Sequence, residues 1–303
     1  MKWLIPFFIA CAVLLQAQAP QNFDNVEVHI LPVQGSIYML VGAGGNITLQ
    51  VGKDGVLLVD TSYVQMAPKV MAAIRTLSDM PIRWIVNTHM HTDHTGGNAA
   101  LAKLGGGAMP RIVANDHVLN RMSVRDAAGK TAAPEADWPN DEYFNPTKDF
   151  FFNNEAVVVY HMPAAHTDGD SVIFFRRSDV ISAGDIFTPN NYPFLDLARG
   201  GSVQGEIDAL NHIIGLTVPA KYQEGGTYVI PGHGRLCEEA DVVEYRDMVT
   251  IIRDRIQDLI KKGKTLDQVK AAKPTLDYDT QYGTGAGAGD RFVEAVYKSL
   301  GGK

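Results

Sequence analysis

The stretch NTHMHTDHTGGN, residues 87–98, brings four potential metal ligands into six consecutive positions: His89, His91, Asp93 and His94. Residues two apart in an extended segment point to the same side, so His89 and His91 can contact one ion. Asp93 and His94 follow on the turn into the next predicted helix and can face a second ion. Because zinc usually takes three or four protein ligands, this segment cannot complete two sites alone.

Three residues at the ends of predicted strands can supply the missing ligands: His166, Asp185 and His233. Each follows an apolar run and is flanked by glycine or another turn residue, which is how a sheet presents side chains at its edge. We expect His166 to complete the first site and His233 to complete the second. The carboxylate of Asp185 can bridge the two ions.

Alternating strands and helices must hold these residues in place. Short strands separated by glycine-rich punctuation fill residues 26–59, and an amphipathic helix follows at 67–79. A buried strand at 82–88 ends where the histidine cluster begins. The other predicted elements are helices at 98–104, 116–122 and 205–216 and strands at 111–115, 150–162, 171–177, 180–187 and 227–232.

The second half of the chain shows no composition break that would mark a linker. The polar, proline-bearing segment 126–148 is expected to be a loop or insertion. A long helix is predicted for about 238–262, and Asp290 is expected to cap the last helix. We interpret residues 20–303 as one α/β domain, in which 263–303 form a helical extension that either covers the active site or braces the fold.

The N-terminal segment and the charge limit the protein's location and partners. Residues 1–19 combine Lys2, a short apolar run and the small-x-small motif Ala17-Gln18-Ala19, which predicts a signal peptide cleaved after Ala17 or Ala19. We therefore expect an exported protein, periplasmic or secreted, without a stable membrane anchor after cleavage. The formal net charge is -7 and no long basic run is present, so nucleic acid is a poor candidate for a partner.

The motifs HMHTDH, HTDGD, GD and GH, in this order and spacing, resemble those of the metallo-β-lactamase superfamily. The likeness covers nearly all of the chain from about residue 26, including the strand end LLVDT. It implies a four-layer αββα sandwich, an α/β (α+β) fold in which two mixed β-sheets pack face to face with helices outside. It also implies two Zn²⁺ ions at one edge, with Asp60 orienting a ligand or the metal-binding loop.

Two zinc ions that hold a water between them lower its pKa from about 15.7 to about 7, so hydroxide is available at neutral pH. This predicts a metal-dependent hydrolase that attacks a lactone, ester or β-lactam, with Asp93 carrying the proton. One β-lactamase subclass has cysteine in place of Asp185 and lysine in place of Thr188, and another lacks the bridging aspartate. Retention of both His94 and Asp185 is similar to the lactonase and glyoxalase branches. A glyoxalase II-type thioesterase, a mono-iron persulfide dioxygenase with Fe instead of zinc, and a non-catalytic zinc-binding protein stay open as alternatives.

A small-molecule substrate needs a pocket, and the sequence offers few signs of one. Aromatic residues in predicted loops could wall an apolar groove above the metals, or could equally pack the insertion against the body. These residues are Trp138, Tyr143, Phe144, Tyr192 and Phe194. No basic residue stands out near the ligands, which argues against phosphodiesters and other strongly anionic substrates. The glycine-rich segments 42–47 and 283–290 lack a nucleotide fingerprint and are expected to be flexible turns.

Overall fold

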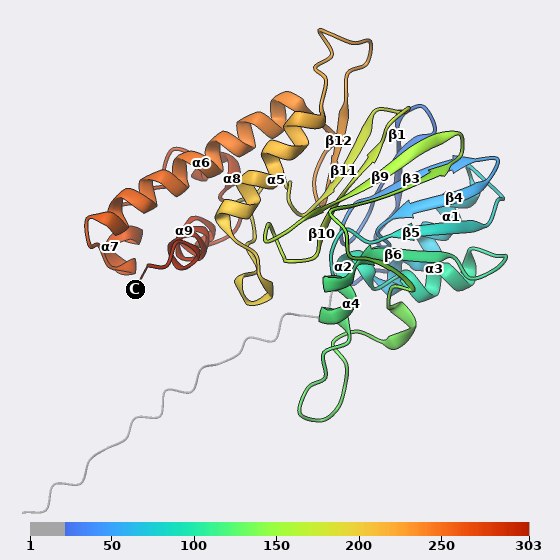
Figure 1. Ribbon diagram of the computed structural model, residues 1–303, viewed down its shortest axis with the longest axis horizontal. Helices are drawn as coiled ribbons and strands as arrows, with labels where there is room; N and C mark the ends of the chain where they lie inside the picture. The colour runs from blue at the N-terminus through green and yellow to red at the C-terminus, as the bar shows by residue number, and fades with distance from the viewer. Residues whose placement is uncertain (1–21, 303) are drawn as a thin grey trace, which may run out of the picture.

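A computed structural model describes residues 22–302, so the predicted signal peptide lies outside the described residues. Two β-sheets pack face to face, and helices cover both outer surfaces (Figure 1). The expected four-layer αββα sandwich with two mixed sheets is therefore confirmed. None of the described helices is long and apolar enough to cross a membrane.

The first sheet contains seven strands of the described chain, in chain order. Neighbours pair antiparallel from β1 to β4 and parallel from β4 to β7. The strands are β1 His29–Gln34, β2 Ile37–Val41, β3 Ile47–Gly52, β4 Gly55–Val59, β5 Ile82–Val86, β6 Arg111–Asn115 and β7 Asp141–Tyr143. Helices α1 (Ala67–Arg75) and α3 (Asn98–Leu104) cover its outer face.

The second sheet has the order β13-β12-β11-β10-β9-β8. Its strands are β8 Thr147–Phe152, β9 Glu155–Met162, β10 Asp170–Phe175, β11 Val180–Gly184, β12 Tyr228–Pro231 and β13 Cys237–Glu238. Only β11 and β12 run parallel, and the other neighbours are antiparallel. Helices α5 (Val203–Leu216) and α6 (Glu239–Lys261) cover the outer face, and α6 confirms the long helix expected at 238–262.

Strand β4 shows why these apolar runs form buried strands. Side chains alternate between the two faces of a strand, so Val56 and Leu58 pack toward α1 while Leu57 and Val59 pack against the second sheet. All four side chains are buried. A strand covered on both faces reads as a continuous apolar run, and this strand ends where polar residues begin, at the edge that carries the candidate site.

The C-terminal extension packs on α6 and shares its core. It contains α7 (Leu266–Ala271), α8 (Asp279–Tyr282) and α9 (Ala288–Ser299), which Figure 1 shows beside α6, away from the two sheets. The buried side chains of Val269, Phe292 and Val296 belong to the same apolar cluster as those of α6. The extension is thus joined to the second sheet through α6 and α5.

Two local expectations are wrong. The segment 126–148 is not all loop, because β7 adds a parallel edge strand to the first sheet. This strand has only three residues, Asp-Glu-Tyr, and is too short and polar to show strand periodicity. The last helix is not capped by Asp290, because Gly287 occupies the N-cap with a left-handed φ of 70° and Asp290 lies in the first turn. The remaining short helices are α2 (Thr92–Thr95) and α4 (Asp116–Met122).

Candidate metal centre

The candidate site lies where strands of both sheets end side by side. Strands β4 and β5 of the first sheet lead into Asp60 and the histidine cluster, and β11 and β12 of the second lead into Asp185 and His233. The turn between β9 and β10 adds His166. The seven predicted ligands form two groups: His89, His91, His166 and Asp185 in one, and Asp93, His94 and His233 in the other.

The first group presents ring nitrogens to one point. Nε2 of His166 lies 2.9 Å from Nδ1 of His91. The outer nitrogen of each ring is already used as a donor, because His166 Nδ1 lies 2.5 Å from the carbonyl oxygen of Phe194 and His91 Nε2 lies 3.0 Å from Oδ2 of Asp196. Neutral rings held in this way turn two lone pairs toward each other, and a cation between them would satisfy both.

The ligand atoms of the second group are similarly close to one another. Oδ2 of Asp93 lies 3.2 Å from Nε2 of His233 and 3.6 Å from Nε2 of His94, and the two Nε2 atoms are 3.4 Å apart. Asp93 is 23% exposed at its side chain, whereas His94 is fully buried. Solvent can therefore reach the carboxylate of this group while the histidine beneath it stays fixed.

Asp185 lies between the two groups. Its Oδ2 is 3.9 Å from Nε2 of His89 and 3.8 Å from Nε2 of His166. Its Oδ1 is 3.2 Å from Nε2 of His94 and 3.5 Å from Nε2 of His233. One oxygen for each group is the arrangement that a bridging carboxylate requires.

Asp60 forms hydrogen bonds with two residues of the segment that carries the histidine cluster. Its Oδ1 accepts from the backbone N–H of Thr88, and its Oδ2 accepts from the Thr88 hydroxyl and from Nδ1 of His94, at 2.8, 2.7 and 2.7 Å. Because the Thr88 proton goes to Asp60, the hydroxyl oxygen is left to accept from Nδ1 of His89 at 3.0 Å. These hydrogen bonds turn Nε2 of both histidines toward the ligand groups described above.

The donor set fits a bound cation. Nε2 of His89 and Oδ1 of Asp185 are buried and have no hydrogen-bond partner within the described residues. Buried polar atoms are rarely left unpaired, since each costs about 1–3 kcal/mol. Imidazole and carboxylate ligands suit zinc and iron alike, so these residues could hold a divalent metal and do not fix its identity.

Electrostatics support the same conclusion for His89 and Asp185. Burial, followed by the nearby His94 and His166, lowers the pKa of His89 well below its usual value and keeps the ring neutral. Burial opposes ionisation of Asp185, yet His94, His89 and His166 hold its pKa well below the ordinary range. A neutral imidazole beside an ionised carboxylate is the state in which both bind metal.

Two glycines let the backbone approach the site closely. A Cβ atom on Gly45 would overlap the ring of His94, and one on Gly232 would overlap Oδ1 of Asp185. The backbone of Gly45 also donates to the carbonyl of Asp93. The segment 42–47, expected to be a flexible turn, is therefore packed directly against the second group.

Comparison with known families decides the identity of the fold. Residues 40–233 match the metallo-beta-lactamase superfamily, which is well over half of the chain. The chain belongs to the metallo-β-lactamase superfamily. No curated protein matches the sequence significantly.

Several solved structures are similar to this chain in fold. The stereoselective inverting sec-alkylsulfatase Pisa1 from Pseudomonas sp. superposes with a TM-score of 0.67 at 19% identity, covering 89% of this chain and 50% of that one. This chain thus spans about half the length of the alkylsulfatase. A metallo-β-lactamase from Pontibacter korlensis gives a TM-score of 0.57 at 14% identity, and DIM-1 metallo-β-lactamase gives 0.56 at 16%. Both lactamase comparisons cover 74% of this chain and nearly all of the other, 99% and 98%.

The aromatic residues that were predicted to line a substrate pocket lie in different parts of the structure. Phe194 is 65% exposed, and its ring centroid lies 5.7 Å from that of His166. Tyr192 is buried but lines, with Phe194, a cavity of about 310 Å³ beside the centre. Trp138 does not line this cavity; it packs beneath α4, and its Nε1 donates to the carbonyl of Ala133. Tyr143 is buried between the sheets.

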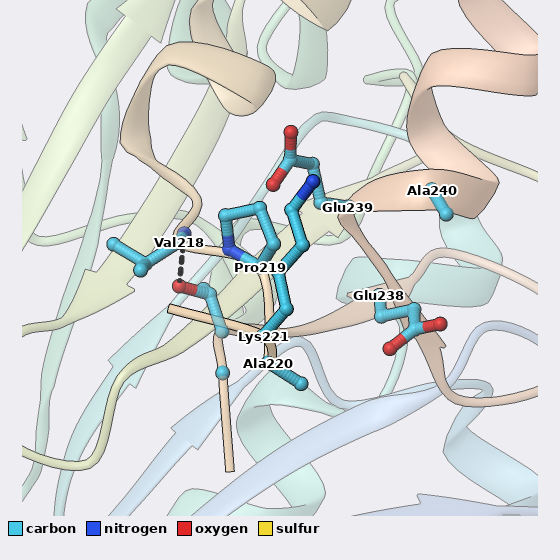
Figure 2. Close-up of a pocket in the computed structure, with 9 residues that line it drawn as sticks. Val218, Pro219, Ala220, Lys221, Glu238, Glu239 and Ala240 are labelled. Carbon is cyan, nitrogen blue, oxygen red and sulfur yellow. Dashed lines mark hydrogen bonds between the residues drawn. The ribbon is translucent and has the colours of Figure 1, made fainter. Parts of the chain in front are cut away.

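Figure 2 shows a second cavity, which has a volume of about 330 Å³ and is lined by none of the predicted metal ligands. Val218 to Lys221, the last residue of β13, Glu238, and the first residues of α6, Glu239 and Ala240, line it. It adjoins the start of β12, whereas His233 follows the end of that strand. Of these two cavities, the one beside Phe194 is the nearer to the candidate metal centre.

Sequence reasoning missed several residues that shape the site: Gly45, Thr88, Asp196 and Gly232, and the carbonyl of Phe194. A backbone carbonyl carries no sequence signal. Asp196 lies between a proline-rich turn and a 3₁₀ turn, where an aspartate is unremarkable. Thr88, directly before His89, is the one residue whose position in the motif could have suggested a role.

Proposed function

We propose that this protein is a dinuclear metal-dependent hydrolase that cleaves an activated acyl bond, in a lactone, an ester or a β-lactam. One observation carries the proposal: Asp185 directs one carboxylate oxygen at each of two groups of ligand atoms. A single-metal site has no use for a carboxylate shared in this way.

Bound zinc ions would make water nucleophilic near neutral pH and would polarise the carbonyl of the substrate. The protein's own residues have distinct parts in this scheme. Asp60 and Asp196 fix the orientation of His94 and His91. Phe194 fixes His166 through its carbonyl and presents its exposed ring beside the reacting bond.

Asp93 is the proposed proton carrier. Burial works against its charge, but the hydrogen bond to His233 and the proximity of His94 lower the pKa of Asp93 below its usual value. The carboxylate is therefore ionised at neutral pH and partly open to solvent. It can accept a proton from the attacking water and release it toward the leaving group.

The proposed substrate class is supported only by the resemblance of the motifs and by the similar structures. Retention of both His94 and Asp185 favours lactones and esters, as in the branches that the motifs resemble. The similar structures are a sec-alkylsulfatase and β-lactamases, so a sulfate ester and a β-lactam belong in any test. Export to the periplasm or beyond, proposed from residues 1–19, would expose the enzyme to such compounds.

A substrate panel tests the proposal. The zinc-loaded protein is assayed with a lactone, a 4-nitrophenyl ester, a chromogenic cephalosporin, a thioester, a phosphodiester and a secondary alkyl sulfate. We expect turnover of at least one carbonyl substrate that stops in Asp93→Asn. Turnover of the thioester alone would select the glyoxalase II-type reading. Absence of hydrolysis, together with one iron per chain in the protein as purified, would select the persulfide dioxygenase alternative. Zinc binding without any turnover would select the non-catalytic alternative.

A further inference from the structure

The cavity beside Phe194, here called the side cavity, has one wall from the catalytic domain and one from the C-terminal extension. Segment 191–195 forms the first wall, and residues of α8, α9 and the loop between them form the second. Its apolar lining includes Pro193, Phe194, Ala288, Phe292 and Ala295. Asn191, Thr284 and Arg291 add polar groups. An apolar cleft with a few polar groups is the usual form of a small-molecule site.

Segment 191–196 connects the side cavity to the metal centre. Toward the centre, the carbonyl of Phe194 and the carboxylate of Asp196 bind His166 and His91. Phe194 itself lines the side cavity, and its ring centroid is 6.1 Å from that of His91. A molecule whose reacting bond lies at the centre can therefore extend past Phe194 into the side cavity.

The extension is held firmly on this segment. The ring of Tyr192 stacks on that of Phe292, with centroids 5.1 Å apart and an interplanar angle of 9°. The Tyr192 hydroxyl donates to Oδ1 of Asp279 at 2.8 Å, and its backbone N–H donates to the carbonyl of Tyr282 at 3.2 Å. The second wall of the side cavity is thus fixed in place by contacts from both α8 and α9.

Arg291 is the cation of the side cavity, and its charge is uncompensated. Its Nη1 donates to the carbonyl of Ala286 at 2.5 Å, and it forms no ion pair with any carboxylate of the described chain. The side chain is exposed. An arginine guanidinium has five donors in a planar fork that matches a carboxylate, so one carbonyl leaves most of its capacity free.

We propose that the side cavity binds the non-reacting part of the substrate, an apolar chain that ends in a carboxylate, with Arg291 as the anchor of that carboxylate. This inference rests on the proposed hydrolase function and deepens it by naming a substrate class. Arg199 and Arg235 lie near the site residues in the sequence, but they pair with Asp196 and Asp241, so neither offers an uncompensated cation. The fold supplies it from the extension, more than fifty positions after His233.

Equilibrium binding tests the proposal without relying on turnover. Calorimetry of the zinc-loaded protein compares straight-chain dicarboxylates, adipate to sebacate, with the monocarboxylates of the same length, hexanoate to decanoate. One carboxylate can occupy the metal centre while the apolar chain crosses the side cavity, so only a dicarboxylate can also reach Arg291. We expect one chain length to favour the dicarboxylate by about tenfold, the effect of one charge-assisted contact.

Substitutions test whether Arg291 causes the preference for dicarboxylates. Arg291→Met keeps the apolar stem and should remove the preference, and Arg291→Lys should keep part of it. The matched control is Lys298→Met on the same helix, whose lysine pairs with Glu294 and does not line the side cavity. The wild-type preference should shrink in high salt because the contact is partly exposed. Absence of any preference in the wild type, or an unchanged preference in Arg291→Met, would overturn the proposal.

A kinetic experiment distinguishes failure of this inference from failure of the hydrolase proposal. The 4-nitrophenyl half-ester of the best dicarboxylate is compared with the ester of the matching monocarboxylate. We expect Arg291→Met to lower the ratio of kcat/KM for these substrates about tenfold. Hydrolysis without this selectivity would refute the anchor alone. Selective binding without hydrolysis of any ester, lactone or β-lactam would refute the hydrolase alone.

Discussion

Nδ1 of His94 lies 2.7 Å from Oδ2 of Asp60, and both side chains are almost completely buried. Asp60 has a left-handed φ of 64° directly after β4, a conformation that aspartate and asparagine tolerate better than most residues. This pair sets which nitrogen of His94 faces Asp93 and His233, the other members of the second group.

Asp60→Asn tests that role while preserving shape and backbone conformation. The amide oxygen can still accept from the Thr88 N–H, which turns the amide nitrogen toward Nδ1 of His94. His94 then has to carry its proton on Nε2, where a metal would bind. We expect the affinity for the second zinc to fall about 10- to 100-fold, measured by competition with a chromophoric chelator.

Asp149→Asn is the control for this substitution, since Asp149 is exposed on β8. It should bind two zinc ions as the wild type does. Equal zinc affinity in both variants would show that Asp60 does not orient His94.

Gly45→Ala tests the close approach of the backbone to the second group. The added methyl would overlap the His94 ring, so the ring has to shift and zinc affinity should fall about tenfold or more. Gly215→Ala in α5 is the matched control, because a Cβ there meets nothing within 4 Å. It should leave zinc binding unchanged and raise stability by up to about 1 kcal/mol. A Gly45→Ala protein that binds zinc normally would contradict the packing described here.

Asp93→Asn tests the proton carrier. The amide preserves size but cannot accept a proton, so kcat should fall at least about 100-fold. Steady-state kinetics at saturating zinc separate this effect from weaker metal binding. A kcat close to that of the wild type, with two metals bound, would exclude Asp93 as the proton carrier.

Glu206 of α5 predicts a pH dependence of stability. Both of its carboxyl oxygens are buried without a partner among the described residues. Burial, with smaller effects of Asp170 and Asp185, raises its pKa well above the usual value of 4.5. The folded protein therefore keeps a proton that the unfolded chain loses, and stability falls as the pH rises from the unfolded pKa toward the folded one.

Glu206→Gln should remove this contribution, worth up to about 1.4 kcal/mol per pH unit. Urea unfolding of the metal-free protein from about pH 5 to pH 8 should show a flatter profile in the variant. Glu224→Gln, in an exposed loop position, should keep the wild-type profile. Identical slopes in all three proteins would mean that Glu206 is ionised in the folded state.

Much of the fold and of the candidate centre was accessible from the sequence because the signals are local. The apolar runs of β4, β5 and β11 each end at a residue of the site, and the spacing of His89 and His91 follows from an extended chain. Helix α6 has a long apolar stripe that predicts its type, and the observed bounds, Glu239–Lys261, lie within one residue of the predicted ones. Such elements depend on periodicity, which a single sequence displays.

The other features of the fold and of the candidate centre depend on contacts between segments that are distant in the sequence. Asp196 reaches His91 across 105 positions, and the stacking of Tyr192 on Phe292 helps to hold the helix of Arg291 beside the side cavity. Strand β7 forms because β6 offers an edge, and its own three residues show no period. Trp138 and Tyr192 are both aromatic residues outside regular strands, yet tertiary packing places only Tyr192 beside the centre.

The central claim is that Asp185 is shared by two metal ions, and metal analysis of the purified protein tests it most directly. The wild type should bind two zinc ions per chain, and Asp185→Asn should lose one or both while Asp149→Asn keeps two. Carbonyl-ester hydrolysis should follow the second equivalent of zinc during titration of the metal-free protein. One iron per chain, or full activity with a single metal, would contradict the account.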